Sequence, residues 1–371
     1  MKKWIAVHFF LAHFCMAVSS PALFLLIGGM AVPSRAQTPP KPPSKTMAPA
    51  PLALKTTIPL PNAKGRLDHV GVDIKGNRVF LAEIGNGGVE AIDLAGGRSL
   101  HLLTGFGEPQ GVYFDPGTNR LFVASGDDGT VKIFDGTTYA PVATAKFSSD
   151  ADNLRFDPRS KRVLVGYGGE KFVGGKAREP QGARGRGDGA LAYVDASGKT
   201  GPEISVDAHP ESFQLEKTGT RVFVNVPDHH EVQVADLSKG TVIAHWPVSC
   251  TDNFPMSIDE AHHRLFIGCR IPAKMEILDT DTGKSVASVD IPGTTDDLFY
   301  DAARGRIYVL GGEGDVDVFA QKDADHYERM ARVRAPVGSR TGMFVPDLNE
   351  LFVSVSQSAK QPAELLVYEA K

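Results

Sequence analysis

The stretch Phe114-Asp115-Pro116-Gly117-Thr118-Asn119-Arg120-Leu121-Phe122-Val123-Ala124 decides the fold, because it recurs along almost the whole chain. It reads as the end of one strand, a tight turn and a second apolar strand. Its arginine, followed by two apolar residues, recurs at positions 78, 120, 162, 221, 264 and 306, and Glu350 replaces it in a seventh copy. These copies are spaced 42, 42, 59, 43, 42 and 44 residues apart. The chain is therefore predicted to be a repeat protein of seven units.

Each unit has room for four short strands. In the second unit the predicted strands are residues 111–114, 121–124, 131–134 and 141–146, with glycine-rich stretches between them and no convincing helical period. Seven units of four strands predict an all-β fold, a seven-bladed β-propeller with four-stranded blades.

The last blade needs a strand from elsewhere in the chain. The seventh unit supplies strands near residues 342–345, 351–355 and 364–368, and then the chain ends. Residues 54–60, before the first unit, have the rhythm of a fourth strand. Because an open ring would leave strand edges unpaired, the last blade is predicted to be closed by the N-terminal strand.

The first 36 residues are predicted to be a signal peptide. Lys2 and Lys3 precede a long apolar run, and Ser34-Arg35-Ala36 places small residues where a signal peptidase cleaves. An uncleaved membrane anchor is the alternative that the length of the run permits. Residues 37–51 contain six prolines and are expected to form a linker, so residues 52–371 make up the propeller domain. We expect a periplasmic or secreted protein with no membrane span after cleavage.

The charge of the chain argues against nucleic-acid binding. Removal of the leader takes away Lys2, Lys3 and Arg35, so the formal net charge moves from −4 to −7. General binding to a phosphate backbone relies on clustered lysines and arginines. A small molecule or a protein is the expected partner, and the chain is expected to be a monomer.

Propeller geometry gathers the residues that precede each innermost strand on one face, here called the top face, around the central channel. Every blade contributes a polar group there, and eight of these groups are carboxylates: Asp68, Glu108, Asp150, Asp152, Glu211, Asp252, Asp296 and Asp297. The candidate ligand-binding residues are Arg66, Asp68, His69, Glu108, Gln110, Asp152, Asn153, Arg155, His209, Glu211, Asn253, Asp296, Asp297 and Arg340.

So many acids at a narrow channel mouth require compensating positive charge. Arginines such as Arg66, Arg155 and Arg340 would supply it in a salt-bridged rim. A bound hard cation is the second possibility, since carboxylates and an amide carbonyl suit Ca²⁺, and no other cofactor is indicated. The candidate ligands are Asp152, Asn153, Glu211 and Asp296. A small polar or cationic ligand is the third possibility.

His69 and His209 lie in this ring, and with Glu211 they are the candidate catalytic groups, although hydrogen-bonded channel histidines are the commoner case. Cys250 and Cys269 belong to the fifth unit, where strand pairing brings Phe254 near Cys269, so a disulfide or two buried thiols are both open. The long spacing reflects a glycine-rich insertion at residues 170–189 with five basic residues, which is either an inert loop or a lid or partner-binding loop.

The repeat Asp-Pro-x-x-x-Arg-Leu-Phe-Val-Ala, followed by Val-x-Ile-Phe-Asp, as it stands in residues 115–135, resembles the YVTN repeat of bacterial exported seven-bladed propellers, the YncE-like group. The resemblance covers residues 52–371. It implies the fold and export, and it assigns no reaction. The same fold class includes Ca²⁺-dependent lactone hydrolases and amine dehydrogenase heavy chains. Binding of a ligand or protein at the channel mouth is therefore the leading expectation, and a Ca²⁺-dependent lactone hydrolase is the alternative.

Overall fold

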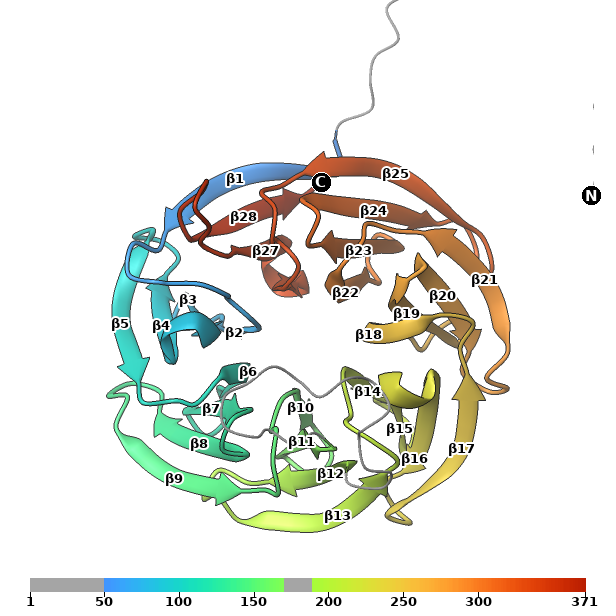
Figure 1. Cartoon of the computed structure of the whole chain (residues 1–371), viewed down its shortest axis with the longest axis horizontal. Helices are drawn as coiled ribbons and strands as arrows, with labels where there is room; N and C mark the ends of the chain where they lie inside the picture. The colour runs from blue at the N-terminus through green and yellow to red at the C-terminus, as the bar shows by residue number, and fades with distance from the viewer. Residues whose placement is uncertain (1–49, 170–188) are drawn as a thin grey trace, which may run out of the picture. The chain divides into compact units, whose positions relative to one another are not determined.

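The computed structural model describes residues 50–169 and 189–371. These residues form seven antiparallel sheets of four strands each, arranged in a ring around a central channel (Figure 1). The all-β, seven-bladed prediction is confirmed. The predicted signal peptide, most of the predicted linker, and residues 170–188 of the predicted insertion lie outside the described residues. Within the described part of the chain, no helix is long and apolar enough to cross a membrane.

The two inner strands of each blade carry the recurring sequence. The innermost strands are β2 (Val70–Asp73), β6 (Pro109–Asp115), β10 (Leu154–Asp157), β14 (Phe213–Leu215), β18 (Thr251–Asp259), β22 (Thr295–Asp301) and β26 (Gly342–Val345). The second strands are β3 (Arg78–Glu83), β7 (Arg120–Ser125), β11 (Arg162–Gly168), β15 (Arg221–Val226), β19 (Arg264–Ile271), β23 (Arg306–Gly311) and β27 (Glu350–Val355). Six of the second strands thus begin at the repeated arginine.

The two outer strands complete each blade. The third strands are β4 (Gly88–Asp93), β8 (Thr130–Asp135), β12 (Gly189–Val194), β16 (Glu231–Asp236), β20 (Ala273–Asp279), β24 (Asp315–Gln321) and β28 (Glu364–Ala370). The outermost strands are β5 (Arg98–Thr104), β9 (Pro141–Lys146), β13 (Thr200–Val206), β17 (Thr241–Pro247), β21 (Ser285–Asp290), β25 (Tyr327–Arg334) and β1 (Leu52–Pro59). Within the described residues, three short 3₁₀ helices lie in loops: η1 (Ile84–Asn86), η2 (Pro227–His229) and η3 (Pro346–Leu348).

The N-terminal strand closes the ring, as predicted. β1 pairs antiparallel with β28 and is the outermost strand of the seventh blade (Figure 1). Glu350, which replaces the repeated arginine, forms an ion pair with Lys55 of β1, whose Nζ lies 2.5 Å from Oε1. The departure from the repeat therefore serves the closure of the ring.

The core lies between adjacent blades. Leu164 of the third blade, for example, packs in one buried cluster with Phe213 and Val224 of the fourth. The repeated arginines stabilise the bottom of the blades: Arg78 pairs with Asp73 at 2.6 Å, and Arg264 pairs with Asp279 at 2.8 Å. The most regular part of the sequence is thus structural.

Candidate functional site

The loops before the innermost strands converge on the top of the channel, here called the channel mouth. Several of these strands begin irregularly. The pairing register shifts between Pro109 and Val112 of β6, between Asn253 and Met256 of β18, and between Thr295 and Asp297 of β22. Such bulges redirect side chains at the end of a strand. They determine which polar groups face the channel mouth and which turn into the blades.

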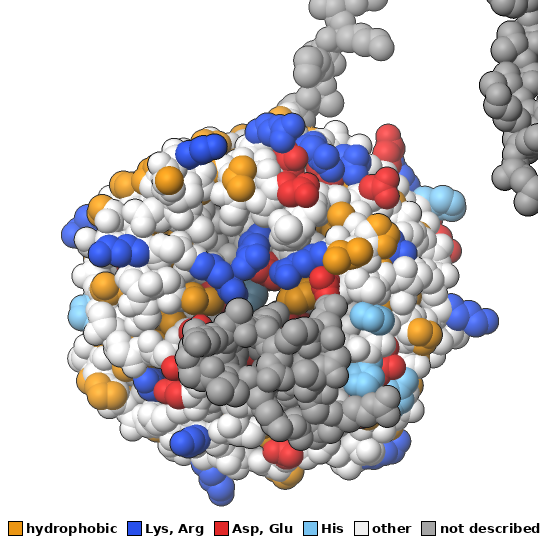
Figure 2. Space-filling model, viewed as in Figure 1, with side chains coloured by type: hydrophobic (Ala, Val, Ile, Leu, Met, Phe, Trp, Pro, Cys, Tyr) orange, Lys and Arg blue, Asp and Glu red, His pale blue; other side chains and the backbone are white. Residues whose placement is uncertain are grey.

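The channel mouth contains a cavity of about 280 Å³. Its lining is almost entirely polar and comes from all seven blades: Arg66, Asp68, His69, Gln110, Asp152, Glu211, Phe254, Arg270, Asp296 and Arg340. Figure 2 shows basic side chains gathered around the central opening, with acidic groups lying deeper. The side chain of Arg66 is 42% exposed and that of Asp68 is 2% exposed, which illustrates this layering.

The three arginines of the mouth are held by two aspartates. Arg66 pairs with Asp68, with Nη2 3.0 Å from Oδ2. Arg270 and Arg340 share Asp296, and the Nε of Arg340 lies 2.8 Å from its Oδ2. Because one carboxylate serves two guanidinium groups, this side of the mouth keeps an excess positive charge. The guanidinium carbon of Arg270 also lies 3.6 Å from the ring centroid of Phe254, a stacking that fixes its plane.

His69 lies between two carboxylates on opposite sides of the channel. Its Nδ1 is 3.3 Å from Asp297 Oδ2, and its Nε2 is 3.9 Å from Asp152 Oδ1. Burial disfavours the imidazolium, but Asp297, Asp68 and Asp152 outweigh it and raise the pKa of His69 to about 10. Burial raises the pKa of Asp68 despite the opposing charges of Arg66 and His69. At neutral pH His69 is therefore a cation, which makes it a poor general base.

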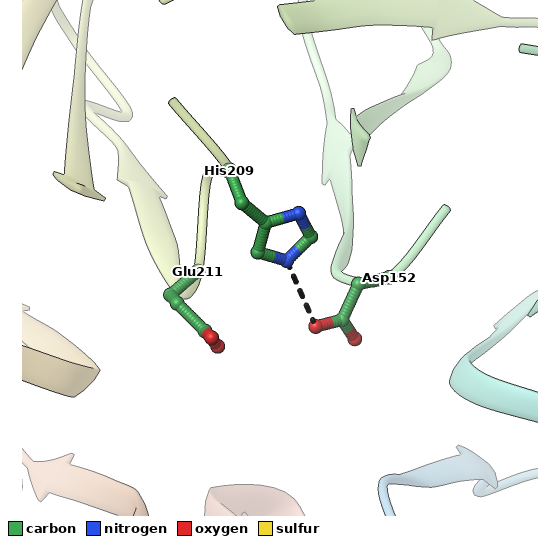
Figure 3. A group of neighbouring side chains, drawn as sticks. All are labelled: Asp152, His209 and Glu211. Carbon is green, nitrogen blue, oxygen red and sulfur yellow. Dashed lines mark ion pairs between the residues drawn. The ribbon is translucent and has the colours of Figure 1, made fainter. Parts of the chain in front are cut away.

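His209 is enclosed by acidic groups deeper in the mouth. Its Nδ1 lies 2.7 Å from the carbonyl oxygen of Gly168, and its Nε2 is 3.8 Å from Asp152 Oδ2 (Figure 3). Burial opposes its protonation, but Asp150, Asp152 and Glu211 raise its pKa well above the usual range. Burial raises the pKa of Asp152, but His209, His69 and Arg66 outweigh this effect, and its pKa is lowered.

A second cavity of about 330 Å³ lies along the channel, and His69 lines both cavities. Asn153, Arg155 and Asp297 line it. Arg155 donates to Ser212 Oγ at 3.2 Å, and burial lowers the pKa of its guanidinium against the opposing charges of Asp297 and Asp152. These residues therefore belong to the channel rather than to its mouth.

Eight of the fourteen predicted ligand-binding residues line the cavity of the mouth: Arg66, Asp68, His69, Gln110, Asp152, Glu211, Asp296 and Arg340. Glu108 lines neither cavity. Asn253 turns into the fourth and fifth blades, where its side-chain amide donates to Asn225 Oδ1 at 3.1 Å. Among the predicted Ca²⁺ ligands, Asp152 and Glu211 come together, whereas Asn153 lines the channel and Asp296 faces two arginines.

Sequence reasoning missed Arg270. It lies at the end of the second strand of the fifth blade, β19, rather than before an innermost strand, yet both positions share the top face of a propeller. Reading the residues at the ends of the second strands would have found it.

A disulfide joins Cys250 and Cys269, whose Cα atoms are 6.1 Å apart. The strand pairing that suggested this pair is displaced by one residue, because Asn253 rather than Phe254 is opposite Cys269. The bulge in β18 causes the displacement. The bond ties Cys250, the residue before β18, to β19, the strand that carries Arg270, and so supports one side of the mouth.

Gly111 lets the second and third blades approach each other at the site. A Cβ atom at this position would lie 2.1 Å from the carbonyl oxygen of Asp152. We expect Gly111→Ala to push Asp152 out of place and to lower the free energy of unfolding by about 2 kcal/mol. Chemical denaturation checks this value. Gly117→Ala, in the bottom turn of the same blade, is the control and should cost far less, since its Cβ would meet Asp115 Oδ1 at 3.2 Å.

The comparisons with known proteins support the fold. A chain in the crystal structure of a mitotic checkpoint complex aligns with a TM-score of 0.67 at 13% sequence identity, covering 92% of this chain and 99% of that chain. No protein-family model and no curated protein matches the chain significantly. At this identity the likeness shows the fold alone. The protein is therefore a seven-bladed β-propeller with a charged cavity at the mouth of its channel.

Proposed function

We propose that the protein binds a small ligand carrying a carboxylate or phosphate group at the channel mouth. One observation carries this proposal: Arg270 and Arg340 share the single carboxylate of Asp296 in a cavity of about 280 Å³. A guanidinium group whose charge is only partly compensated is a good partner for an anion, because it can donate two parallel hydrogen bonds. The third arginine, Arg66, lines the same cavity and is the most exposed of the three.

The layering of charge also favours a ligand that enters from the top face. An incoming anion meets the arginines first, and its remaining polar groups reach Asp152, Glu211 and Gln110 on the deeper wall. This arrangement selects a ligand with an acidic group at one end and hydrogen-bond donors at the other. The Ca²⁺-dependent lactone hydrolase gains no comparable support, because Asp296 is held by two arginines.

The family and the cellular location of the protein are part of the same proposal. The repeat supports membership of the YncE-like group, and the leader supports export to the periplasm, where the disulfide would be stable. A periplasmic propeller of this kind would act as a monomeric binding protein.

A screen of small carboxylates and phosphates by thermal shift, followed by calorimetry on the hits, tests the proposed binding. We expect Arg270→Ala combined with Arg340→Ala to weaken binding at least about 100-fold, since two charge-assisted hydrogen-bond partners are lost. Added salt should weaken wild-type binding as well. All titrations contain a chelator, so that metal ions play no part.

The matched control is Arg332→Ala. This substitution removes an arginine of the outer strand β25 that pairs with Asp317 of β24. It should leave the affinity unchanged. A screen that yields cationic ligands alone, or an anion whose affinity survives the double substitution, contradicts the proposal.

A further inference from the structure

Three side chains on the floor of the mouth have the arrangement of a metal site. Asp152 precedes β10, and His209 and Glu211 precede β14. Each offers one ligand atom, and these atoms all lie within 4.8 Å of one another (Figure 3). All three residues are buried. We propose that Asp152, His209 and Glu211 bind one divalent transition-metal ion of the Zn²⁺ type.

The orientation of His209 is the first step. Its Nδ1 lies 2.7 Å from the carbonyl oxygen of Gly168, so this nitrogen donates to the backbone and Nε2 points toward Asp152 and Glu211. Metal-bound histidines commonly donate their other ring nitrogen to a carbonyl or carboxylate in this way. The backbone therefore holds Nε2 facing the two carboxylates, and a bound ion would take the place of the proton on this nitrogen.

The spacing of the ligand atoms is the second step. Nε2 of His209 and Oδ2 of Asp152 are 3.8 Å apart, too far for a direct hydrogen bond, which spans about 2.7–3.2 Å. Two ligands bonded to Zn²⁺ at about 2.1 Å each can be up to about 4.2 Å apart. One ion between them closes this gap, and binding would draw the three side chains slightly together.

Asp152 supplies an independent observation. The Asp152 side chain is buried, with only 6% of the residue exposed, yet its Oδ1 has no hydrogen-bond partner within the described part of the chain. A buried carboxylate oxygen without a partner is costly unless a ligand satisfies it. This oxygen lies 3.9 Å from Nε2 of His69, beyond hydrogen-bond distance, and the other oxygen of the same carboxylate faces Nε2 of His209.

The donor set selects the kind of ion. One imidazole nitrogen with two carboxylates suits Zn²⁺ and similar divalent ions better than Ca²⁺, which prefers six to eight oxygen ligands. Asp152 and Glu211 also line the cavity of the mouth, so the free coordination positions of the ion would face that cavity. This metal site shares Asp152 and Glu211 with the predicted Ca²⁺ site but uses His209 in place of Asn153 and Asp296. None of its ligands is one of the arginines on which the anion-binding proposal rests.

The test is calorimetric titration of the full chain with Zn²⁺ alone, after removal of metal by a chelator. We expect one ion per chain with a dissociation constant below about 1 μM. Asp152→Asn and Glu211→Gln should each weaken binding at least about 30-fold. Both substitutions keep the side-chain shape, and a melting curve of each variant verifies that the propeller is folded.

His245→Ala is the matched control. In the described residues the other group of this kind is Asp207, Glu231 and His245, which is largely exposed on the fourth blade. The control should leave the tight site intact. Absence of Zn²⁺ binding, binding that His245→Ala alone removes, or binding unaffected by Asp152→Asn and Glu211→Gln would each overturn the proposal. Loss of Zn²⁺ binding with retained anion binding would leave the proposed function standing.

Discussion

Deletion of residues 52–59 should lower the melting temperature of the protein by about 10 °C or more. These residues form β1, which pairs with β28 through seven residue pairs. Leu52 packs into the buried cluster that includes Val318 of the sixth blade, and Ile58 into the cluster that includes Leu81 of the first. Each buried aliphatic side chain contributes about 2–3 kcal/mol, and the deletion also exposes the edge of β28. Differential scanning calorimetry measures the effect.

Two point substitutions within β1 test whether the stabilisation comes from its buried side chains. Ile58→Ala should cost about 2–4 kcal/mol, because Ile58 is fully buried. Leu54→Ala in the same strand should cost little, since Leu54 is 55% exposed. A melting temperature that the deletion leaves unchanged would mean that the ring does not depend on β1 for its closure.

The closure of the ring was predictable because it follows from counting strands. The seventh unit lacks one strand, and the chain offers one matching segment before the first unit. The ion pair from Lys55 to Glu350 was not predicted, although Glu350 was visible as a departure from the repeat. Its partner belongs to a strand almost three hundred residues away, which no local pattern identifies.

The candidate site was predictable to the extent that the repeat places its residues. The positions before each innermost strand must lie at the mouth, and eight of the fourteen predicted residues line its cavity. The pairing among them depends on bulges and side-chain directions that differ between blades. Asn253 turns inward at such a bulge, and Asp296 is held by arginines from the fifth and seventh blades. The sequence alone therefore could not distinguish a cation site from an arginine-rich rim.

The substitution Glu83→Gln should stabilise the protein at pH 8–9. The carboxyl groups of Glu83 in β3 and Glu90 in β4 are buried, and neither receives a hydrogen bond from a described donor group within 3.5 Å. Burial and the neighbouring Glu90 raise the pKa of Glu83 from 4.5 to about 8. The folded state therefore holds a proton that the unfolded state releases at lower pH.

The sign of the pH dependence follows from this difference. Between pH 4.5 and pH 8 the folded state binds more protons than the unfolded state, so the free energy of unfolding decreases as the pH rises. A tenfold difference between the acid dissociation constants of the folded and unfolded states changes the free energy of unfolding by about 1.4 kcal/mol. Because solvent screening weakens the effect, we expect the free energy of unfolding to decrease by about 2–4 kcal/mol in total over this pH range. Glu83→Gln removes the titrating group, so its advantage over the wild type should increase from pH 5 to pH 8. Urea unfolding at several pH values measures this difference.

Glu276→Gln is the matched control. Glu276 occupies the position in the fifth blade that corresponds to Glu90, three residues before the aspartate that precedes the turn. Its carboxylate accepts hydrogen bonds from the backbone nitrogen and the hydroxyl of Ser249, at 2.9 and 2.8 Å. Because the amide of glutamine is a weaker acceptor for these two hydrogen bonds, the substitution should destabilise the protein at pH 8. If Glu83→Gln destabilises the protein at pH 8, as Glu276→Gln is expected to do, then Glu83 is not a protonated group in the folded protein.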